Sequence, residues 1–163
     1  DVVKDESAPF IVKTESGKIE VLGTEFNIKC YSDESALVTT LVNGKVKFDD
    51  GMNPSVILKP EEQLIFEKEN CQSIVRKINV NHYIGWKDNR LSFQGERLDM
   101  IMKTLSRWYN VEVVFEDSTL KALEFSGNLD KFTNIQEFLS LFELGVNVKF
   151  EIKDRTVYIR KGN

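Results

Sequence analysis

The chain has 163 residues, 41% hydrophobic and 10% aromatic, with a formal net charge of -4 at pH 7. This length and composition can bury a hydrophobic core in one large or two small domains. Acidic and basic residues are interspersed without a basic stripe, which argues against DNA or RNA as a partner. No apolar run approaches the ~20 residues that cross a bilayer.

The first half of the chain has the pattern of short strands. From Pro9 to about Ile78, runs rich in Val, Ile, Thr and Phe show apolar residues at every second position, and turn signals separate the runs at about eight to twelve residues. This spacing predicts an all-β region, arranged as a β-sandwich, a barrel or a β-helix-like coil of strands.

Two turns in this half carry specific predictions. Asn43-Gly44 is the strongest hairpin signal, because both central residues of a type I′ turn need a positive φ, and it predicts a hairpin between residues 36–42 and 45–48. The run Asp49 to Asn53 has some features of a calcium loop. Its glycine comes too early, however, and Pro60 stands where the bidentate glutamate would be, so we interpret this run as a hairpin tip.

Past residue 79 the pattern changes to helices alternating with strands. Apolar residues from Leu98 to Trp108 recur at i, i+3, i+4 and i+7, which predicts a helix that Asn110 ends in the left-handed conformation. A second helix follows Thr133 and stops at Gly145. With the alternating runs between and after them, residues 90 to 160 predict a small α+β module of order β-α-β-β-α-β-β. We therefore expect two domains, residues 1–84 and 85–163.

The sequence offers little for catalysis, and it predicts neither a metal site nor a cofactor. The single histidine, His82, falls in the predicted linker with no clear partner to orient it. There is no Cys-x-x-Cys motif or Cys/His cluster. Alternation places Cys30 on the apolar face of a strand and Cys71 in a polar turn, so the sequence leaves their pairing open.

Several segments, in order along the chain, carry a resemblance to a known family. They are Pro9–Thr14, Gly17–Ile28, Leu41–Val46, Leu58–Gln63, Trp86 with Leu91–Phe93, and Arg107–Val111. In these segments the chain resembles the periplasmic region of FecR-family anti-sigma factors. Residues 85–163 are similar to the short N-terminal domain of secretins and TonB-dependent transporters, which FecR-like proteins typically carry after the FecR domain.

The resemblance implies a protein of signal transduction and transcription regulation. It implies the periplasmic domain of a single-pass inner-membrane protein that binds the N-terminal signalling domain of a TonB-dependent outer-membrane transporter. It also implies regulation of an extracytoplasmic-function (ECF) sigma factor, through a cytoplasmic segment and a membrane helix that this sequence lacks. The start at Asp1 is consistent with a processed or excised piece of a longer protein. The resemblance implies no catalytic residues.

We expect protein–protein interaction without chemistry, in which the smaller module presents an edge strand to the transporter domain. The candidate contacts are apolar residues beside the glycine-marked strand and at the domain junction: Trp86, Phe125, Leu129 and Phe132. Two other functions remain open, because a fold does not determine a function. One is a non-catalytic glycan-binding or envelope scaffold module, and the other is a hydrolase that uses scattered carboxylates.

Overall fold

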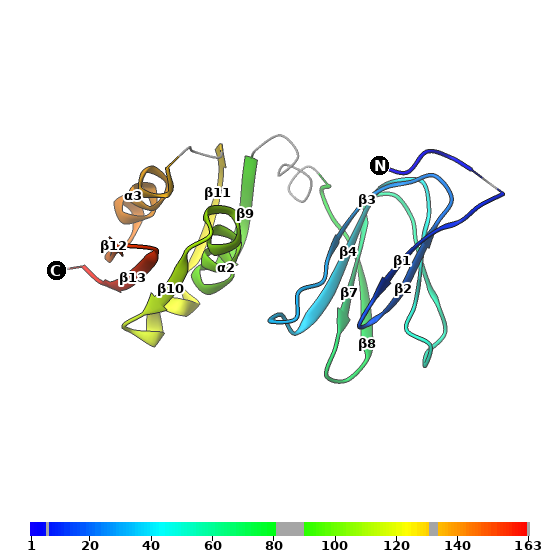
Figure 1. Ribbon diagram of the computed structural model, residues 1–163, viewed down its shortest axis with the longest axis horizontal. Coiled ribbons are helices and arrows are strands. Elements are labelled where there is room, and N and C mark those ends of the chain that lie inside the picture. Colours follow the sequence, from blue (N-terminus) through cyan, green and yellow to red (C-terminus); the bar gives the residue numbers. More distant parts are fainter. Residues whose placement is uncertain (6, 81–89, 131–133, 163) are drawn as a thin grey trace. The chain divides into compact units, whose positions relative to one another are not determined.

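The computed structural model describes residues 1–5, 7–80, 90–130 and 134–162 (Figure 1). The chain divides into two compact units, Asp1–Ile84 and Gly85–Asn163. Within the described residues the fold is mainly β with two α-helices, as predicted, and it has four open sheets, none of which closes into a barrel. None of the helices in the described ranges combines the length and the apolar character needed to cross a membrane.

The first unit consists of two antiparallel sheets, with strand orders β1-β2-β5-β6 and β3-β4-β7-β8. Alternate side chains of the strands other than β8 point to the space between the sheets, where they form one hydrophobic core. This is the arrangement of a β-sandwich. The strands are β1 (Phe10–Thr14), β2 (Gly17–Val21), β3 (Glu25–Lys29), β4 (Ala36–Asn43), β5 (Val46–Asp49), β6 (Val56–Leu58), β7 (Glu62–Glu67) and β8 (Gln72–Lys77). The buried residues are Ile19, Val21, Leu37, Leu41, Val46, Phe48, Leu58, Leu64 and Phe66.

The predicted hairpin at Asn43-Gly44 is wrong. Strand β4 pairs with β3 and β7, whereas β5 pairs with β2 and β6, so the turn carries the chain from one sheet to the other. Gly44 has a φ of 92°, but Asn43 does not have the positive φ of a type I′ turn. The crossover lets Leu41 and Val46, both fully buried, enter the shared core from opposite sheets. Gly44 is required there because an added Cβ would lie 2.6 Å from the carbonyl oxygen of Gly23.

The second unit contains a two-stranded sheet, β11-β9, and a three-stranded sheet, β10-β13-β12, in which β10 runs parallel to β13. Its elements are β9 (Arg90–Arg97), α2 (Leu98–Tyr109), β10 (Glu112–Phe115), the 3-10 helix η2 (Ser118–Ala122), β11 (Glu124–Asp130), α3 (Ile135–Gly145), β12 (Val148–Lys153) and β13 (Thr156–Lys161). The sequence did not indicate η2. The predicted core residue Trp108 is partly buried and packs against the core of this unit.

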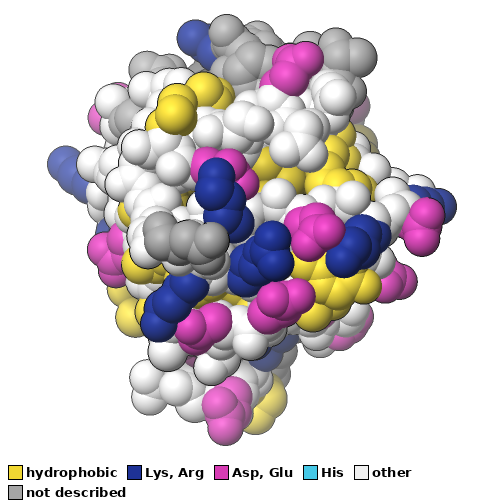
Figure 2. Space-filling view, turned by 90° about the vertical axis from the view of Figure 1, so that its left-hand side faces the viewer, with side chains coloured by type: hydrophobic (Ala, Val, Ile, Leu, Met, Phe, Trp, Pro, Cys, Tyr) yellow, Lys and Arg dark blue, Asp and Glu magenta, His cyan; other side chains and the backbone are white. Residues whose placement is uncertain are grey.

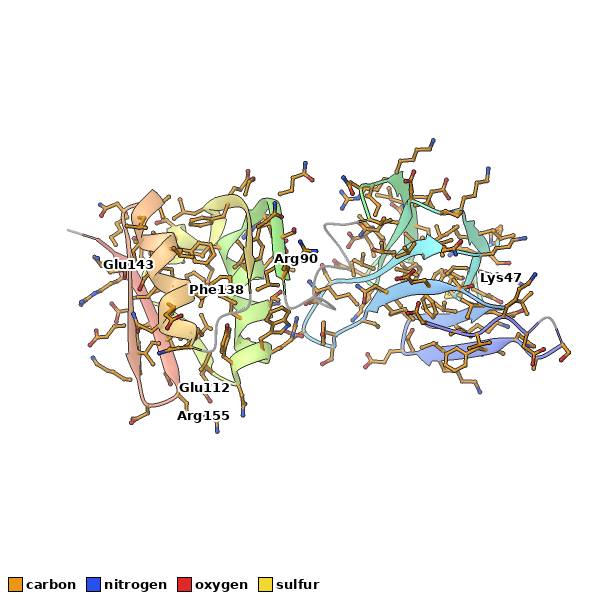
Figure 3. The ribbon with its side chains drawn as sticks, turned by 90° about the horizontal axis from the view of Figure 1, so that it is seen from above. Lys47, Arg90, Glu112, Phe138, Glu143 and Arg155 are labelled. Carbon is orange, nitrogen blue, oxygen red and sulfur yellow. The ribbon has the colours of Figure 1, made fainter. Side chains whose placement is uncertain are left out.

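Both helices place an apolar stripe in that core. Leu98, Ile101, Met102 and Leu105 of α2 are buried with Phe138 and Phe142 of α3 (Figure 3). The α3 helix begins at its N-cap Asn134, whose side-chain oxygen accepts a hydrogen bond from the backbone N–H of Gln136 at 2.8 Å. Thr133, the residue proposed to begin this helix, lies outside the described residues.

A corner after α2 sets the parallel pairing of β10 with β13. Asn110 ends α2 in the left-handed conformation, as predicted, with φ 53° and ψ 53°. The guanidinium of Arg155 donates to the carbonyl oxygen of Asn110 at 2.7 Å, and the N–H of Glu112 donates to the carbonyl oxygen of Arg155 at 2.7 Å (Figure 3). These bonds tie the start of β10 to the turn between β12 and β13.

Two neighbouring threonines in β4 have opposite environments. Thr39 points into the sandwich core, where its hydroxyl is buried without a hydrogen-bond partner among the described residues. Thr40 points to the other face and accepts from the amide nitrogen of Gln63 at 2.8 Å. Gln63 in turn accepts from the guanidinium of Arg76 at 2.7 Å. One hydroxyl is therefore desolvated without compensation, and the other belongs to a hydrogen-bonded chain.

We predict that Thr39→Val raises the free energy of unfolding of the first unit by about 1 kcal/mol, because a methyl group replaces an unsatisfied hydroxyl. The matched variant Thr40→Val should lower it by about 1–2 kcal/mol, because Gln63 loses an acceptor. Native-state hydrogen exchange of the β4 and β7 amides measures both changes. Shifts of the same sign and size would contradict this assignment.

Candidate functional site at the strand edges

The described residues show no arrangement typical of catalysis. No group of three or more His, Cys, Asp or Glu side chains in these ranges could hold a metal ion. Each described carboxylate whose pKa clearly departs from its ordinary value has a lowered pKa. A general acid needs a raised pKa, so these groups are suited to ion pairs and caps rather than to proton donation.

Asp117 and Asp50 show what these carboxylates do. The pKa of Asp117 is lowered to about 2, first by hydrogen bonds from the hydroxyl and backbone N–H of Thr119 and then by Lys161, which lies 3.2 Å away. The bond from the Thr119 N–H also makes Asp117 the N-cap of η2. Asp50 accepts from the backbone N–H groups of Met52 and Asn53, each within 2.9 Å. Strands β5 and β6 pair antiparallel around that loop, which confirms the predicted hairpin tip.

The two cysteines do not form a reactive pair. Cys30 and Cys71 are both free and partly buried, and both pack against the core of the first unit, so no disulfide joins them. Cys71 lies in a turn with a φ of 54°. His82 lies outside the described residues.

Strand edges are the main binding features of this fold. An edge strand presents backbone N–H and C=O groups on one side, and a partner strand can pair with them. Whether an edge can bind depends on whether those groups already have partners. The edge strands of this protein differ in whether these groups already have partners.

The edge of β12 is closed by a side chain from α3. In β12 the amide of Phe150 points away from β13, because Asn147, three residues earlier, accepts from Gly162 on the β13 side. Oε1 of Glu143 accepts from the Phe150 amide at 2.8 Å, and Oε2 of Glu143 pairs with Lys149 at 2.8 Å (Figure 3). The pKa of Glu143 is held below its ordinary value, mainly by the contact with Lys149 and then by the hydrogen bond from the Phe150 amide. A partner strand would have to displace this carboxylate.

The outward face of β12 and β13 is covered by charges of both signs. Figure 2 looks at the side of the molecule on which these strands lie in Figure 1, and there Lys and Arg side chains alternate with Asp and Glu. Glu151 pairs with Lys153 at 3.0 Å and with Arg160 at 3.9 Å, and the Lys153 ammonium lies 5.6 Å from the centre of the Tyr158 ring. Exposed pairs of this kind add little to stability, because water and salt screen them. The face favours neither a strongly acidic nor a strongly basic partner.

The edge of β11 is more open. In the described part of the chain β11 pairs only with β9, with a register shift between Phe125 and Gly127. Ser126 accepts from the N–H of Gly95 at 2.8 Å, and the Asn128 side chain bonds to Ser92, so these polar groups are held by β9. An added Cβ at Gly127 would meet nothing within 4 Å. The sheet face at Gly127 is therefore uncovered.

The four contacts predicted from the sequence fall at different places. Trp86 and Phe132 lie outside the described residues. Leu129 is in β11, where its backbone pairs with Leu91, but its side chain is not among those described. Phe125 packs edge-on against Phe142, with ring centroids 4.8 Å apart, and is only partly exposed. Phe125 thus contributes to the core of the second unit, a role that the sequence pattern did not distinguish from partner contact.

Glu143 is a residue that sequence reasoning missed. Its position within the apolar stretch Phe138–Leu144 marked it only as a polar residue on a helix. Its contacts with residues six and seven positions later depend on how α3 turns back along β12. An acidic residue at the end of a helix that precedes an edge strand was the available signal.

Two family models match the chain. The model described as "FecR, C-terminal" matches residues 90–159, and the model described as "FecR protein" matches residues 1–47. Two crystal structures of a candidate anti-sigma factor from Parabacteroides distasonis are similar, with TM-scores of 0.87 and 0.86 and 23% sequence identity in each case. Each match covers 99% of this chain, and they cover 76% and 75% of those chains. At this identity the likeness shows the fold. A search of curated proteins gave no match.

We predict that Glu143→Ala lowers the protection of the Phe150 amide against hydrogen exchange at least tenfold at pH 7, because hydrogen bonds to a charged acceptor contribute about 1.5–3 kcal/mol. Glu137→Ala, an exposed change on the same helix, should leave it unaltered.

The protection also depends on pH. The pKa of Glu143 is lowered in the folded chain, so its stabilising contribution is present above the ordinary pKa of 4.5 and is lost as the pH falls through the folded value. In the unsubstituted chain the protection factor of the Phe150 amide should therefore decrease when the pH is lowered below 4.5. A protection factor that neither Glu143→Ala nor acid changes would show that this edge is closed by something else.

Proposed function

Because the chain belongs to the FecR family of anti-sigma factors, we propose that it is the periplasmic, signal-receiving region of such a protein. In this proposal the second unit binds the N-terminal signalling domain of a TonB-dependent outer-membrane transporter. Binding changes the activity of an ECF sigma factor, which is held by a cytoplasmic segment of the same protein beyond a single inner-membrane helix. The function is binding without chemistry.

The observation that carries the proposal is the open edge of β11 within the segment that matches the FecR C-terminal model. Residues 90–159 include both β11 and the closed edge of β12. Of these two edges, β12 has its outward Phe150 amide bonded to Glu143, whereas β11 pairs only with β9 among the described residues and its face is uncovered at Gly127. We therefore place the transporter domain along β11, where it adds a strand to the β11-β9 sheet.

Trp86, Leu129 and Phe132 remain proposed contacts with the transporter domain. Alanine substitution of each should weaken binding while leaving the fold intact. Phe125 needs a separate stability measurement, because Phe125→Ala also removes a ring that packs on Phe142. Loss of a buried Phe side chain costs about 3–5 kcal/mol when fully buried, so a change in affinity there would otherwise be ambiguous.

The proposal predicts saturable 1:1 binding of this chain to the signalling domain of one transporter encoded beside it, measured by calorimetric titration. Gly127→Lys should raise the Kd at least tenfold, because a long charged side chain on the face of β11 opposes the addition of a strand beside it. Gly145→Lys is the matched control: its added Cβ also meets nothing within 4 Å, and it should change the Kd less than twofold. Neither glycine has a positive φ, so both variants should fold.

Three results would count against the proposal. No binding by the folded chain to any such domain would contradict the function. Equal weakening by Gly127→Lys and Gly145→Lys would contradict the β11 site while leaving the function in place. Direct affinity for glycans without affinity for a signalling domain would favour the scaffold or glycan-binding alternative.

A further inference from the structure

A second exposed edge lies in the first unit, on β8. All six side chains of this strand are exposed, including those of Ile74 at 56% and Val75 at 42%. In the described part of the chain β8 pairs only with β7. Apolar side chains exposed on both faces of an edge strand are unusual, because they make the strand able to pair with another chain.

The backbone groups on this free edge can be identified from the pairing with β7. The N–H of Ile78 donates to the carbonyl oxygen of Glu61 at 2.9 Å, so Ile78 points toward β7. In an antiparallel ladder the direction of the backbone groups alternates. The N–H and C=O groups of Ser73, Val75 and Lys77 therefore point away from β7, at the free edge.

We propose that β8 pairs antiparallel with β8 of a second copy of this chain, about a two-fold axis at Val75. In this register Val75 lies opposite Val75 of the second copy, and Ser73 lies opposite its Lys77. All three outward-pointing residues then meet outward-pointing residues of the other strand. On the opposite face Ile74 lies against Arg76 of the second copy, whose aliphatic stem can cover it.

The other symmetric registers are less favourable. A centre at Ile74 would pair the outward groups of Ser73 and Val75 only, because Lys77 would then lie opposite Cys71, which has a left-handed φ of 54°. A centre at Arg76 would place two guanidinium groups directly opposite each other, which destabilises a strand pair. A centre at Lys77 would place two ammonium groups directly opposite each other, which destabilises a strand pair. A centre at Ser73 would need Cys71 to pair as a strand, but Cys71 has a left-handed φ of 54°. Only the register about Val75 pairs the outward groups of Ser73, Val75 and Lys77 together without such a conflict.

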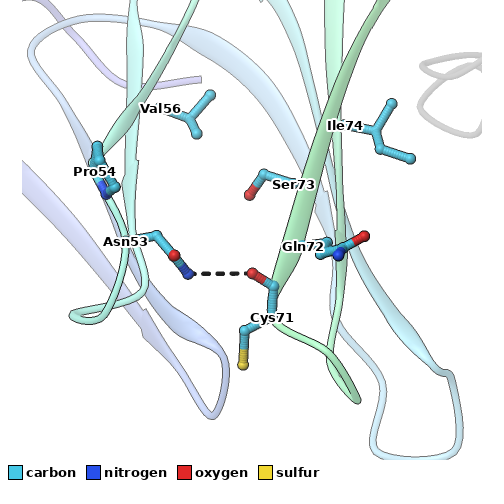
Figure 4. A pocket seen from close by; sticks show the side chains of 7 residues that line it. All are labelled: Asn53, Pro54, Val56, Cys71, Gln72, Ser73 and Ile74. Carbon is cyan, nitrogen blue, oxygen red and sulfur yellow. Dashed lines mark hydrogen bonds between the residues drawn. The ribbon is translucent and has the colours of Figure 1, made fainter.

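A groove beside β8 receives the inner-face side chains of the added strand. It has a volume of about 310 Å³ and opens between the β6 and β8 ends of the sandwich. Figure 4 shows Val56 and Ser73 pointing toward each other across it, with Ile74 on the far side of β8. Its lining is closed at one end by the amide of Asn53, which donates to the carbonyl oxygen of Cys71 at 3.2 Å. In the proposed pairing Lys77 of the second copy, opposite Ser73, lies over this groove.

The charge of Lys77 favours the proposed register over shifted or longer pairings of β8. Lys77 neighbours Glu62 across the β7-β8 ladder, and in the proposed register it faces an uncharged serine. An inward-pointing lysine near the end of an edge strand opposes shifted or longer pairings. One short strand pair buries little surface, so we expect a weak dimer that forms at high concentration.

Disulfide trapping tests the register directly, in a chain that carries Cys30→Ala and Cys71→Asn. Paired residues of a hydrogen-bonded antiparallel position have Cα atoms about 5.5 Å apart, which suits a disulfide. Val75→Cys should therefore form a disulfide-linked dimer at least ten times faster than Ser73→Cys. The Ser73 positions of the two copies lie about 13 Å apart in this register. The double variant Ser73→Cys with Lys77→Cys should again crosslink rapidly.

Sedimentation of the full chain up to about 1 mM supplies the second readout. A concentration-dependent dimer that Val75→Lys weakens at least tenfold, and that Ile57→Lys on β6 does not weaken, would support the proposal. Equal crosslinking of Val75→Cys and Ser73→Cys would overturn it, as would a monomer at every concentration. These variants lie outside the second unit, so this result is independent of binding to a transporter domain.

Discussion

The unpaired backbone groups at sheet edges are the constraint on which the rest of this structure depends. In the described residues the chain forms four open sheets of two to four strands, and none closes on itself. Each sheet therefore ends in strands whose N–H and C=O groups need a partner, water or a covering side chain. The fold is stable through its two hydrophobic cores, but its capacity to bind is set by how each edge is treated.

The edges are treated in different ways. In β12 the outward amide of Phe150 donates to Glu143. An isolated bridge between Val2 and Thr24 covers the chain just before β3. Strand β6 has only three residues and follows closely after Pro54. The β11 edge is left with open space at Gly127, and β8 is left with exposed apolar side chains. In the two proposals the transporter domain pairs with β11 and a second copy pairs with β8, so they would not compete for the same strand.

Local patterns predicted the elements, and long-range packing decided their partners. The stripe from Leu98 to Trp108 and the left-handed Asn110 gave α2 nearly to the residue, because helix periodicity and capping are encoded within one segment. Asn43-Gly44 has equally strong local chemistry, yet burial of Leu41 and Val46 in a shared core directs the chain to the other sheet. The edge closure by Glu143 escaped prediction for the same reason, since it depends on where α3 lies along β12.

We propose that this region receives a signal through the β11 edge. Hydrogen exchange of the chain with and without a cognate transporter signalling domain tests this most directly. We expect the β11 amides to gain protection on binding, while the Phe150 amide, already bonded to Glu143, changes little. Protection that appears on β12 instead of β11, or in neither unit when the two proteins are bound, would contradict it.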